Sequence, residues 1–147
     1  MNPPRYFRLL IIEDDPARIR LIQSWLPADV RVNVASSAGR AMGTLRRDTG
    51  NVYSGILLDH DLQDQRVTEE DQELSASDLL SLIIQHIAPD VPVLVHSMNP
   101  VGAPMMVRSL ETAGFYVTRI RMCDLNRGNF QEWLAEAREI WADQWDE

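Results

Sequence analysis

Three short runs of aliphatic residues, each followed by polar and titratable side chains, constrain the fold of this chain most strongly. The runs are 9–12 before Glu13, Asp14 and Asp15, 56–58 before Asp59, His60 and Asp61, and 93–95 before His96, Ser97 and Asn99. Uninterrupted aliphatic runs of this length are typical of parallel strands that are buried on both faces. Because the carboxyl ends of parallel strands meet at one edge of a sheet, we expect these polar groups to lie together.

Segments with helical periodicity separate the strands. The expected order is a strand at 8–12, a helix at 16–26, a strand at 30–34, a helix from Ser36 or Ser37 to Arg47, a strand at 52–59, a helix capped by Ser75 or Ser77, a strand at 91–95, a helix ending near Ala113 at Gly114, a strand at 115–122 and a last helix that carries Phe130 to Trp141. Five strands alternating with five helices predict an α/β fold with helices on both faces of a parallel sheet. The alternation of apolar and polar residues at 30–34 favours a strand near the sheet edge.

One connection is much longer than the others. Residues 63–77 are polar and acidic, and they contain little that a core would bury. Connections of this length in compact α/β units are often lids or mobile loops. A solvated surface loop without a function is the alternative interpretation.

Composition narrows the possible partners and environment. The chain has 147 residues, enough for a single domain that spans 1–147, and a net charge of −8, which disfavours broad binding to double-stranded nucleic acid or to an anionic membrane. No apolar run is long enough to cross a bilayer, and the first residues lack the apolar core of a secretory signal. The lone Cys123 excludes an internal disulfide. We therefore expect a soluble cytoplasmic protein.

The pattern of acids resembles the receiver domains of bacterial response regulators. The (βα)₅ order, the acidic triplet Glu13 to Asp15 and Asp59 after the third strand carry this resemblance. It implies a flavodoxin-like, three-layer fold with a five-stranded parallel sheet of order 2-1-3-4-5. It also implies Mg²⁺ held by Glu13, Asp14, Asp15 and Asp59, with Asp59 as phosphoacceptor. The family's lysine after the fifth strand is missing, because all 14 basic residues are arginines.

A narrower resemblance accounts for the two histidines. Asp59-His60-Asp61-Leu62 and His96-Ser97-Met98-Asn99-Pro100 are similar to the DHDL and HSMNP motifs of the cyclic-phosphate-processing receiver-like domains. The resemblance covers nearly the whole chain, and the second motif is the more specific one. It implies chemistry on a cyclic phosphate of a nucleotide or of an RNA end.

The residue types suit that chemistry. Hydrolysis of a cyclic phosphodiester needs an acid, a base or a metal ion that activates water, and donors for the phosphoryl oxygens. We expect His60 and His96 to divide the acid and base roles. Asp59 and Asp61 complete the expected catalytic set, Asp59 as a metal ligand and Asp61 by orienting an imidazole or joining the metal shell. The carboxylates suit Mg²⁺ or Mn²⁺, and Ser97 and Asn99 suit phosphate binding.

Each of these roles has a structural alternative. Asp15 stands before Pro16, so helix capping is an equally good reason for its presence. The two histidines can also be buried imidazoles that neighbouring carboxylates satisfy. The leading functional hypothesis is a metal-assisted phosphoesterase or binder of a cyclic phosphate. The alternative is a non-enzymatic, receiver-derived interaction module that binds Mg²⁺ and accepts a phosphoryl group on Asp59.

Overall fold

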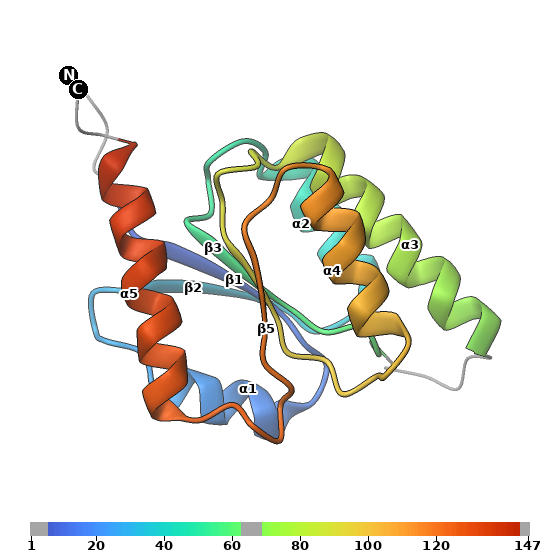
Figure 1. The fold of residues 1–147 in the computed structure, drawn as a ribbon, viewed down its shortest axis with the longest axis horizontal. Helices are drawn as coiled ribbons and strands as arrows, with labels where there is room; N and C mark the ends of the chain where they lie inside the picture. Colours follow the sequence, from blue (N-terminus) through green and yellow to red (C-terminus); the bar gives the residue numbers. More distant parts are fainter. Residues whose placement is uncertain (1–5, 63–68, 145–147) are drawn as a thin grey trace.

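The computed structural model describes residues 6–62 and 69–144, the latter with side chains from residue 76 onward, and over this part of the chain five strands alternate with five helices (Figure 1). In chain order the elements are β1 (Arg8–Ile12), α1 (Pro16–Ser24), β2 (Arg31–Ala35), α2 (Ala38–Arg47), β3 (Gly55–Leu58), α3 (Glu69–His86), β4 (Val93–Val95), α4 (Gly102–Thr112), β5 (Val117–Arg119) and α5 (Arg127–Asp143). None of the described helices is long and apolar enough to cross a membrane.

The five strands form one parallel sheet in the order β2-β1-β3-β4-β5, which confirms the predicted fold class and strand order. As the alternation at 30–34 predicts, β2 lies at an edge of the sheet. The register pairs Ile12 with Leu58 and Leu58 with Val95. The three polar strand ends therefore follow directly from three neighbouring, level positions.

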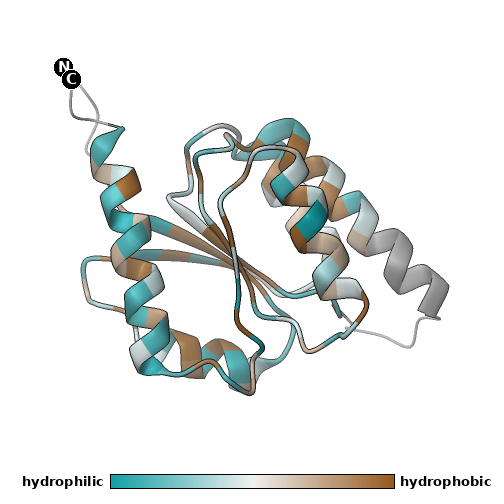
Figure 2. Cartoon of the chain, viewed as in Figure 1, coloured by the Kyte–Doolittle hydropathy of each residue, from teal (hydrophilic) through white to brown (hydrophobic). Residues whose placement is uncertain are grey.

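Helices cover both faces of the sheet. Figure 1 shows α1 and α5 on one side, and α2, α3 and α4 on the other. Alternate strand residues divide accordingly: Leu57 and Leu94 pack with Ile22 of α1 and with the aromatic side chains of α5, whereas Ile56 and Leu58 pack beneath α2, α3 and α4. The strands are the most hydrophobic part of the drawing (Figure 2). Burying an aliphatic side chain fully contributes about 1.5–3 kcal/mol to the stability of the fold. The packed central strands therefore fix the positions of their carboxyl ends.

The predicted start of the third helix is wrong. Helix α3 begins at Glu69 rather than at a cap on Ser75 or Ser77, so much of the expected loop is helical. No glycine or proline interrupts the segment, and it is rich in residue types with favourable helix propensity. The rest of the predicted connection, 63–68, lies outside the described residues.

Three strands are shorter than predicted, and of these β4 covers 93–95 rather than 91–95. Strand β3 starts at Gly55 rather than at residue 52, since the residues before it form a turn in which the buried Tyr53 donates a hydrogen bond from its hydroxyl to Asp48. Strand β5 covers 117–119 rather than 115–122. The predicted start of α2 and the predicted end of α4 are confirmed. Ser37 caps α2 by accepting a hydrogen bond from the Arg40 N–H, and Gly114 adopts a φ of 95° after α4.

Candidate functional site

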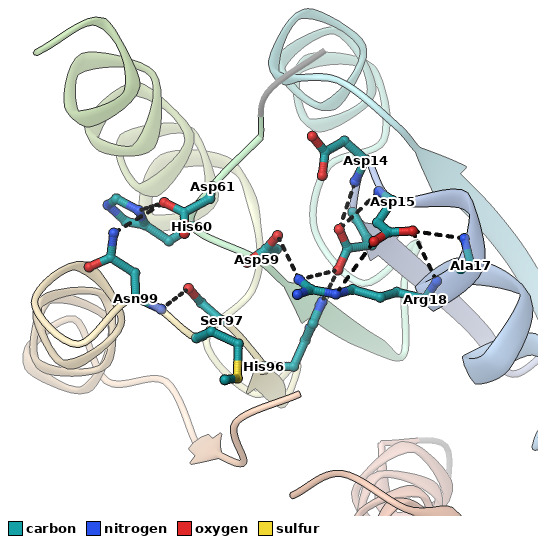
Figure 3. A network of polar contacts seen from close by, with 12 residues as sticks. Asp14, Asp15, Ala17, Arg18, Asp59, His60, Asp61, His96, Ser97 and Asn99 are labelled. Carbon is teal, nitrogen blue, oxygen red and sulfur yellow. Dashed lines mark hydrogen bonds and ion pairs between the residues drawn. The ribbon is translucent and has the colours of Figure 1, made fainter. Parts of the chain in front are cut away.

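The carboxyl ends of β1 and β3 open into a cleft of about 480 Å³, here called the acidic cleft. The described residues that line it are Asp14, Asp15, Arg18, Asp59, Asp61 and Met98. Figure 3 shows the acids of the β1–α1 loop and of the β3 end on either side of the Arg18 side chain. Four carboxylates and a single guanidinium line the cleft, so a phosphate group can enter it only together with additional positive charge.

Beneath the cleft lie three buried groups, Glu13, Asp59 and His96, here called the floor group. One potential ligand atom of each lies within 4.8 Å of the others, and their exposed fractions are 0%, 2% and 0%. Backbone pairing sets this geometry. The Asp59 N–H donates to the Ile12 carbonyl and the His96 N–H donates to the Leu58 carbonyl, each at 3.1 Å. The structure thus brings the ends of three strands together at one place.

Both oxygens of Glu13 are engaged. Oε2 accepts hydrogen bonds from the N–H groups of Asp14 and Asp15 at 2.9 and 3.1 Å, and Oε1 lies 3.0 Å from His96 Nε2. Burial raises the pKa of Glu13, but the hydrogen bond and charge of His96 and the bonds from the loop outweigh it and lower the pKa to about 2. Glu13 is therefore ionised and accepts, so Nε2 of His96 carries the proton in this contact.

Asp59 has the opposite character. Burial, followed by the charge of Glu13, raises the pKa of Asp59 from its ordinary value to about 6. The Arg18 guanidinium forms an ion pair with both acids: its Nη1 lies 3.9 Å from Asp59 Oδ2 and 3.6 Å from Glu13 Oε1. Ionising Asp59 beside Glu13 costs free energy, and a cation bound between them would remove that cost.

His60 does not join the floor group. Successive strand residues point to opposite faces, and the 4% exposed His60 ring lies against the start of α4. Its Nδ1 lies 2.8 Å from Asp61 Oδ1, which also accepts a hydrogen bond from the Asn99 side-chain amide at 3.1 Å. Asp61 lines the cleft with its side chain 36% exposed. His60 therefore faces the cleft only through Asp61.

Ser97 and Asn99 build the turn into α4. The Ser97 hydroxyl oxygen accepts a hydrogen bond from the Asn99 N–H at 3.1 Å, and Asn99 Oδ1 accepts from the N–H groups of Val101 and Gly102 at 3.0 and 2.7 Å. Neither side chain is among the described residues that line the acidic cleft. These contacts give both residues a structural task, and their phosphate-binding role stays a prediction.

Asp15 caps helix α1, which confirms that structural interpretation of it. Its Oδ1 accepts hydrogen bonds from the N–H groups of Ala17 and Arg18 at 2.9 and 3.4 Å. The other oxygen, Oδ2, lies 3.8 Å from Arg18 Nε. Asp14 and Asp15 stand at the rim of the cleft rather than in the floor group.

Sequence reasoning missed two residues that line the cleft, Arg18 and Met98. Arg18 reaches the cleft from the first turn of α1, and Met98 from the loop after β4. The only sequence signal for Arg18 is its i+3 spacing from Asp15, which places the two side chains on one helix face. Met98 carries no signal of its own beyond membership of the second motif.

The contact between His60 and Gly102 gives a first testable prediction. A Cβ at Gly102 would lie closer than 3.0 Å to three atoms of the His60 imidazole. We therefore expect Gly102→Ala to lower the free energy of unfolding by about 1–3 kcal/mol, because the buried ring has to move. Urea denaturation measures the change.

Two variants make this prediction specific. Gly43→Ala in α2, where a Cβ meets nothing within 4 Å, is the matched control and is expected to stabilise by about 0.5–1 kcal/mol. The double variant His60→Ala/Gly102→Ala should lose less stability than the two single losses added together, because the ring that clashes with the new Cβ is gone. Strictly additive stability changes would contradict this prediction, because they would show that the two positions are not in steric contact.

Comparison with protein families identifies the family of the chain. Residues 9–112, which contain both histidine motifs, match the model of the cyclic-phosphate processing receiver domain. The chain belongs to this family. In this cyclic-phosphate processing receiver, both motifs fall at the carboxyl ends of the strands described above. Comparison with curated proteins yields no significant match.

Solved structures support the receiver fold independently. A CheY-like response regulator receiver domain from Methanospirillum hungatei aligns with a TM-score of 0.68 at 17% identity, over 95% of this chain and 99% of that one. The signal receiver domain of a putative LuxO repressor protein from Vibrio parahaemolyticus gives 0.65 at 16%, over 95% and 96%. A sensor protein from Polaromonas gives 0.62 at 22%, over 91% and 96%. These likenesses establish the fold.

The basic residues of this cyclic-phosphate processing receiver are all arginines, and the two at the end of β5 are engaged outside the acidic cleft. Arg119 Nη2 donates to the Ser97 carbonyl at 3.4 Å, and Arg121 pairs with Asp124 at 3.0 Å. Among the described residues that line the acidic cleft, Arg18 is the one basic side chain.

Proposed function

We propose that the acidic cleft binds a cyclic phosphodiester together with a divalent cation, Mg²⁺ or Mn²⁺, and hydrolyses it to a phosphomonoester. The observation that carries this proposal is the floor group, which places two buried carboxylates and an imidazole within 4.8 Å of one another directly beneath an open cleft. Membership of the cyclic-phosphate processing receivers supports the substrate class. The substrate is a nucleotide or the end of an RNA.

The donor set fits a divalent cation. Glu13, Asp59 and His96 offer two hard oxygens and one nitrogen, a combination that Mn²⁺ accepts once His96 Nε2 has released its proton. Burial, and then the charge of Glu13, raises the pKa of Asp59, so a cation beside it would favour its ionised form. Asp14 at the rim adds a further carboxylate. When bound, the cation would supply an activated water molecule and positive charge for the phosphoryl oxygens.

The chain's own residues supply the proton transfers. In hydrolysis the water oxygen forms a bond to phosphorus while one ring P–O bond breaks, and a proton passes from the water to the leaving alkoxide. Asp61 suits this transfer because it lines the cleft and is held at Oδ1 by His60 and Asn99. We assign His60 to positioning Asp61, since its own ring is buried away from the cleft.

A second candidate function rests on Asp59 alone. Its carboxylate lines the cleft at the end of β3, where a small phosphodonor can reach it. In this function the chain would be a receiver-derived interaction module that is phosphorylated on Asp59. Incubation with acetyl phosphate followed by intact mass would detect this: a species heavier by one phosphoryl group, mapped to Asp59, favours the module.

The experiment that tests the proposed function is turnover of a panel of cyclic mononucleotides and RNA ends with terminal cyclic phosphates. We expect conversion of at least one substrate to its monoester when Mn²⁺ or Mg²⁺ is present, and its loss on addition of a chelator. Product detection by chromatography distinguishes hydrolysis from binding. No conversion of any substrate with either cation, together with phosphoryl transfer to Asp59, would replace the hydrolase by the interaction module.

A further inference from the structure

The arginine in the first turn of α1 has a position that neither motif explains. Arg18 Nη1 lies 3.6 Å from Glu13 Oε1 and 3.9 Å from Asp59 Oδ2, so its charge is placed against two members of the floor group. Figure 3 shows the side chain extended across the cleft toward Asp59. A guanidinium in this position acts as the counter-cation of the floor group.

The contacts of Arg18 are loose. Its three ion pairs, with Glu13, Asp15 and Asp59, span 3.6–3.9 Å, which is longer than a hydrogen bond. The guanidinium carries five N–H donors in a planar fork that matches phosphate oxygens. Its side chain is 34% exposed and lines the cleft, so the fork can be reached by a ligand.

We propose that Arg18 is the phosphate-binding residue of the acidic cleft and that it exchanges places with the divalent cation. Like charges repel, so a cation bound to Glu13 and Asp59 removes the two contacts that hold the guanidinium against the floor. The released fork then binds the oxygens of a phosphodiester in the same cleft. This inference rests on the proposed function and names the side chain that supplies the anion-binding charge in a chain without lysine.

The exchange has a signature of two opposite effects. Removing the Arg18 charge should strengthen cation binding, because the guanidinium no longer competes for Glu13 and Asp59, and should weaken phosphate binding, because the fork is lost. A residue that only stabilises the fold would change both affinities in the same direction. A residue that only stabilises the acids would leave phosphate binding unchanged.

The test uses Mn²⁺ alone and dimethyl phosphate, a phosphodiester that carries one negative charge, as probes in calorimetric titrations. For Arg18→Gln we expect Mn²⁺ to bind about fivefold more tightly, the size of one partly exposed ion pair. Dimethyl phosphate in the presence of Mn²⁺ should bind about tenfold more weakly, the size of a charge-assisted hydrogen bond. Arg18→Lys should recover part of the phosphate affinity, since it keeps the charge but not the fork.

Arg20→Gln is the matched control, because Arg20 is exposed on the same helix and makes the same change in net charge. Equal effects of Arg18→Gln and Arg20→Gln would overturn the inference, since they would reflect net charge alone. Unchanged dimethyl phosphate binding in Arg18→Gln would also overturn it. If the wild-type chain binds dimethyl phosphate through Arg18 but turns over no cyclic phosphate, the inference stands and the hydrolase falls. Binding of neither probe by the wild-type chain would overturn both.

Discussion

His96→Gln is expected to reduce turnover of the cyclic phosphate by about 10²-fold or more and to weaken Mn²⁺ binding by a similar factor. The imidazole contributes one of the three donor atoms of the floor group and fixes Glu13 through a contact of 3.0 Å. A glutamine amide can still donate to Glu13 from this buried position, but it replaces the imidazole nitrogen with a poor ligand. Initial rates and Mn²⁺ titration by electron paramagnetic resonance measure the two losses.

Stability separates this result from unfolding. Because Gln preserves a donor for Glu13, the free energy of unfolding should fall by only about 1–3 kcal/mol. His86→Gln, at the end of α3, is the matched control and should change neither rate nor affinity. A folded His96→Gln protein with wild-type turnover and Mn²⁺ affinity would remove His96 from the site.

Asp59→Asn is expected to stabilise the metal-free protein at pH 7 by about 2–3 kcal/mol. The pKa of Asp59 is raised from 3.8 to about 6, first by burial and then by the charge of Glu13. Each pKa unit corresponds to about 1.4 kcal/mol, so an ionised Asp59 costs the folded state close to 3 kcal/mol. An amide of the same shape carries no such cost.

The sign of the pH dependence follows from the same shift. A carboxyl with a raised folded-state pKa stabilises the fold below pH 4, and that contribution is lost as the pH rises from 4 to 6. The advantage of Asp59→Asn should therefore be small at pH 4 and reach its full size above pH 6. Denaturant midpoints in chelator across this range measure it. Asp78→Asn, an exposed position on α3, is the control for the loss of one negative charge.

Divalent cation should cancel most of the stability difference between the two proteins. At 100 times its dissociation constant, a ligand of the folded state stabilises it by about 2.7 kcal/mol. The wild-type protein should show this increment with Mn²⁺, and Asp59→Asn should lose most of it. An equal response of both proteins to Mn²⁺ would show that the Asp59 carboxylate is not a ligand.

The sequence predicted the architecture well because the central strands are uninterrupted aliphatic runs and the residues that end them lie next to them in the sequence. Strand order came from the resemblance to receivers, and the capping role of Asp15 came from the proline that follows it. The start of α3 was missed because an acidic, polar segment has the composition of a loop. The same charged residue types also favour the start of a helix, so composition alone does not separate the two possibilities.

The site was predicted less completely, for two physical reasons. Adjacent strand residues point to opposite faces, so His60 and His96 could not both turn toward Asp59 in the register that β3 and β4 adopt. Arg18 was missed because a long side chain on a neighbouring helix reaches the cleft from outside the strand ends. Reach across several ångströms depends on how α1 packs, which local patterns do not encode.

The difference in burial between the floor and the rim of the cleft has a consequence for how such a domain can diversify. Glu13, Asp59 and His96 are buried at the ends of paired strands, where Glu13 and His96 also contact each other. Asp14 and Met98 stand at the rim on the loops after β1 and β4, and Met98 is 40% exposed. Substitutions at the rim can therefore alter the shape and charge presented to a ligand without preventing folding. Homologous domains can thus keep the same floor group while they bind different ligands.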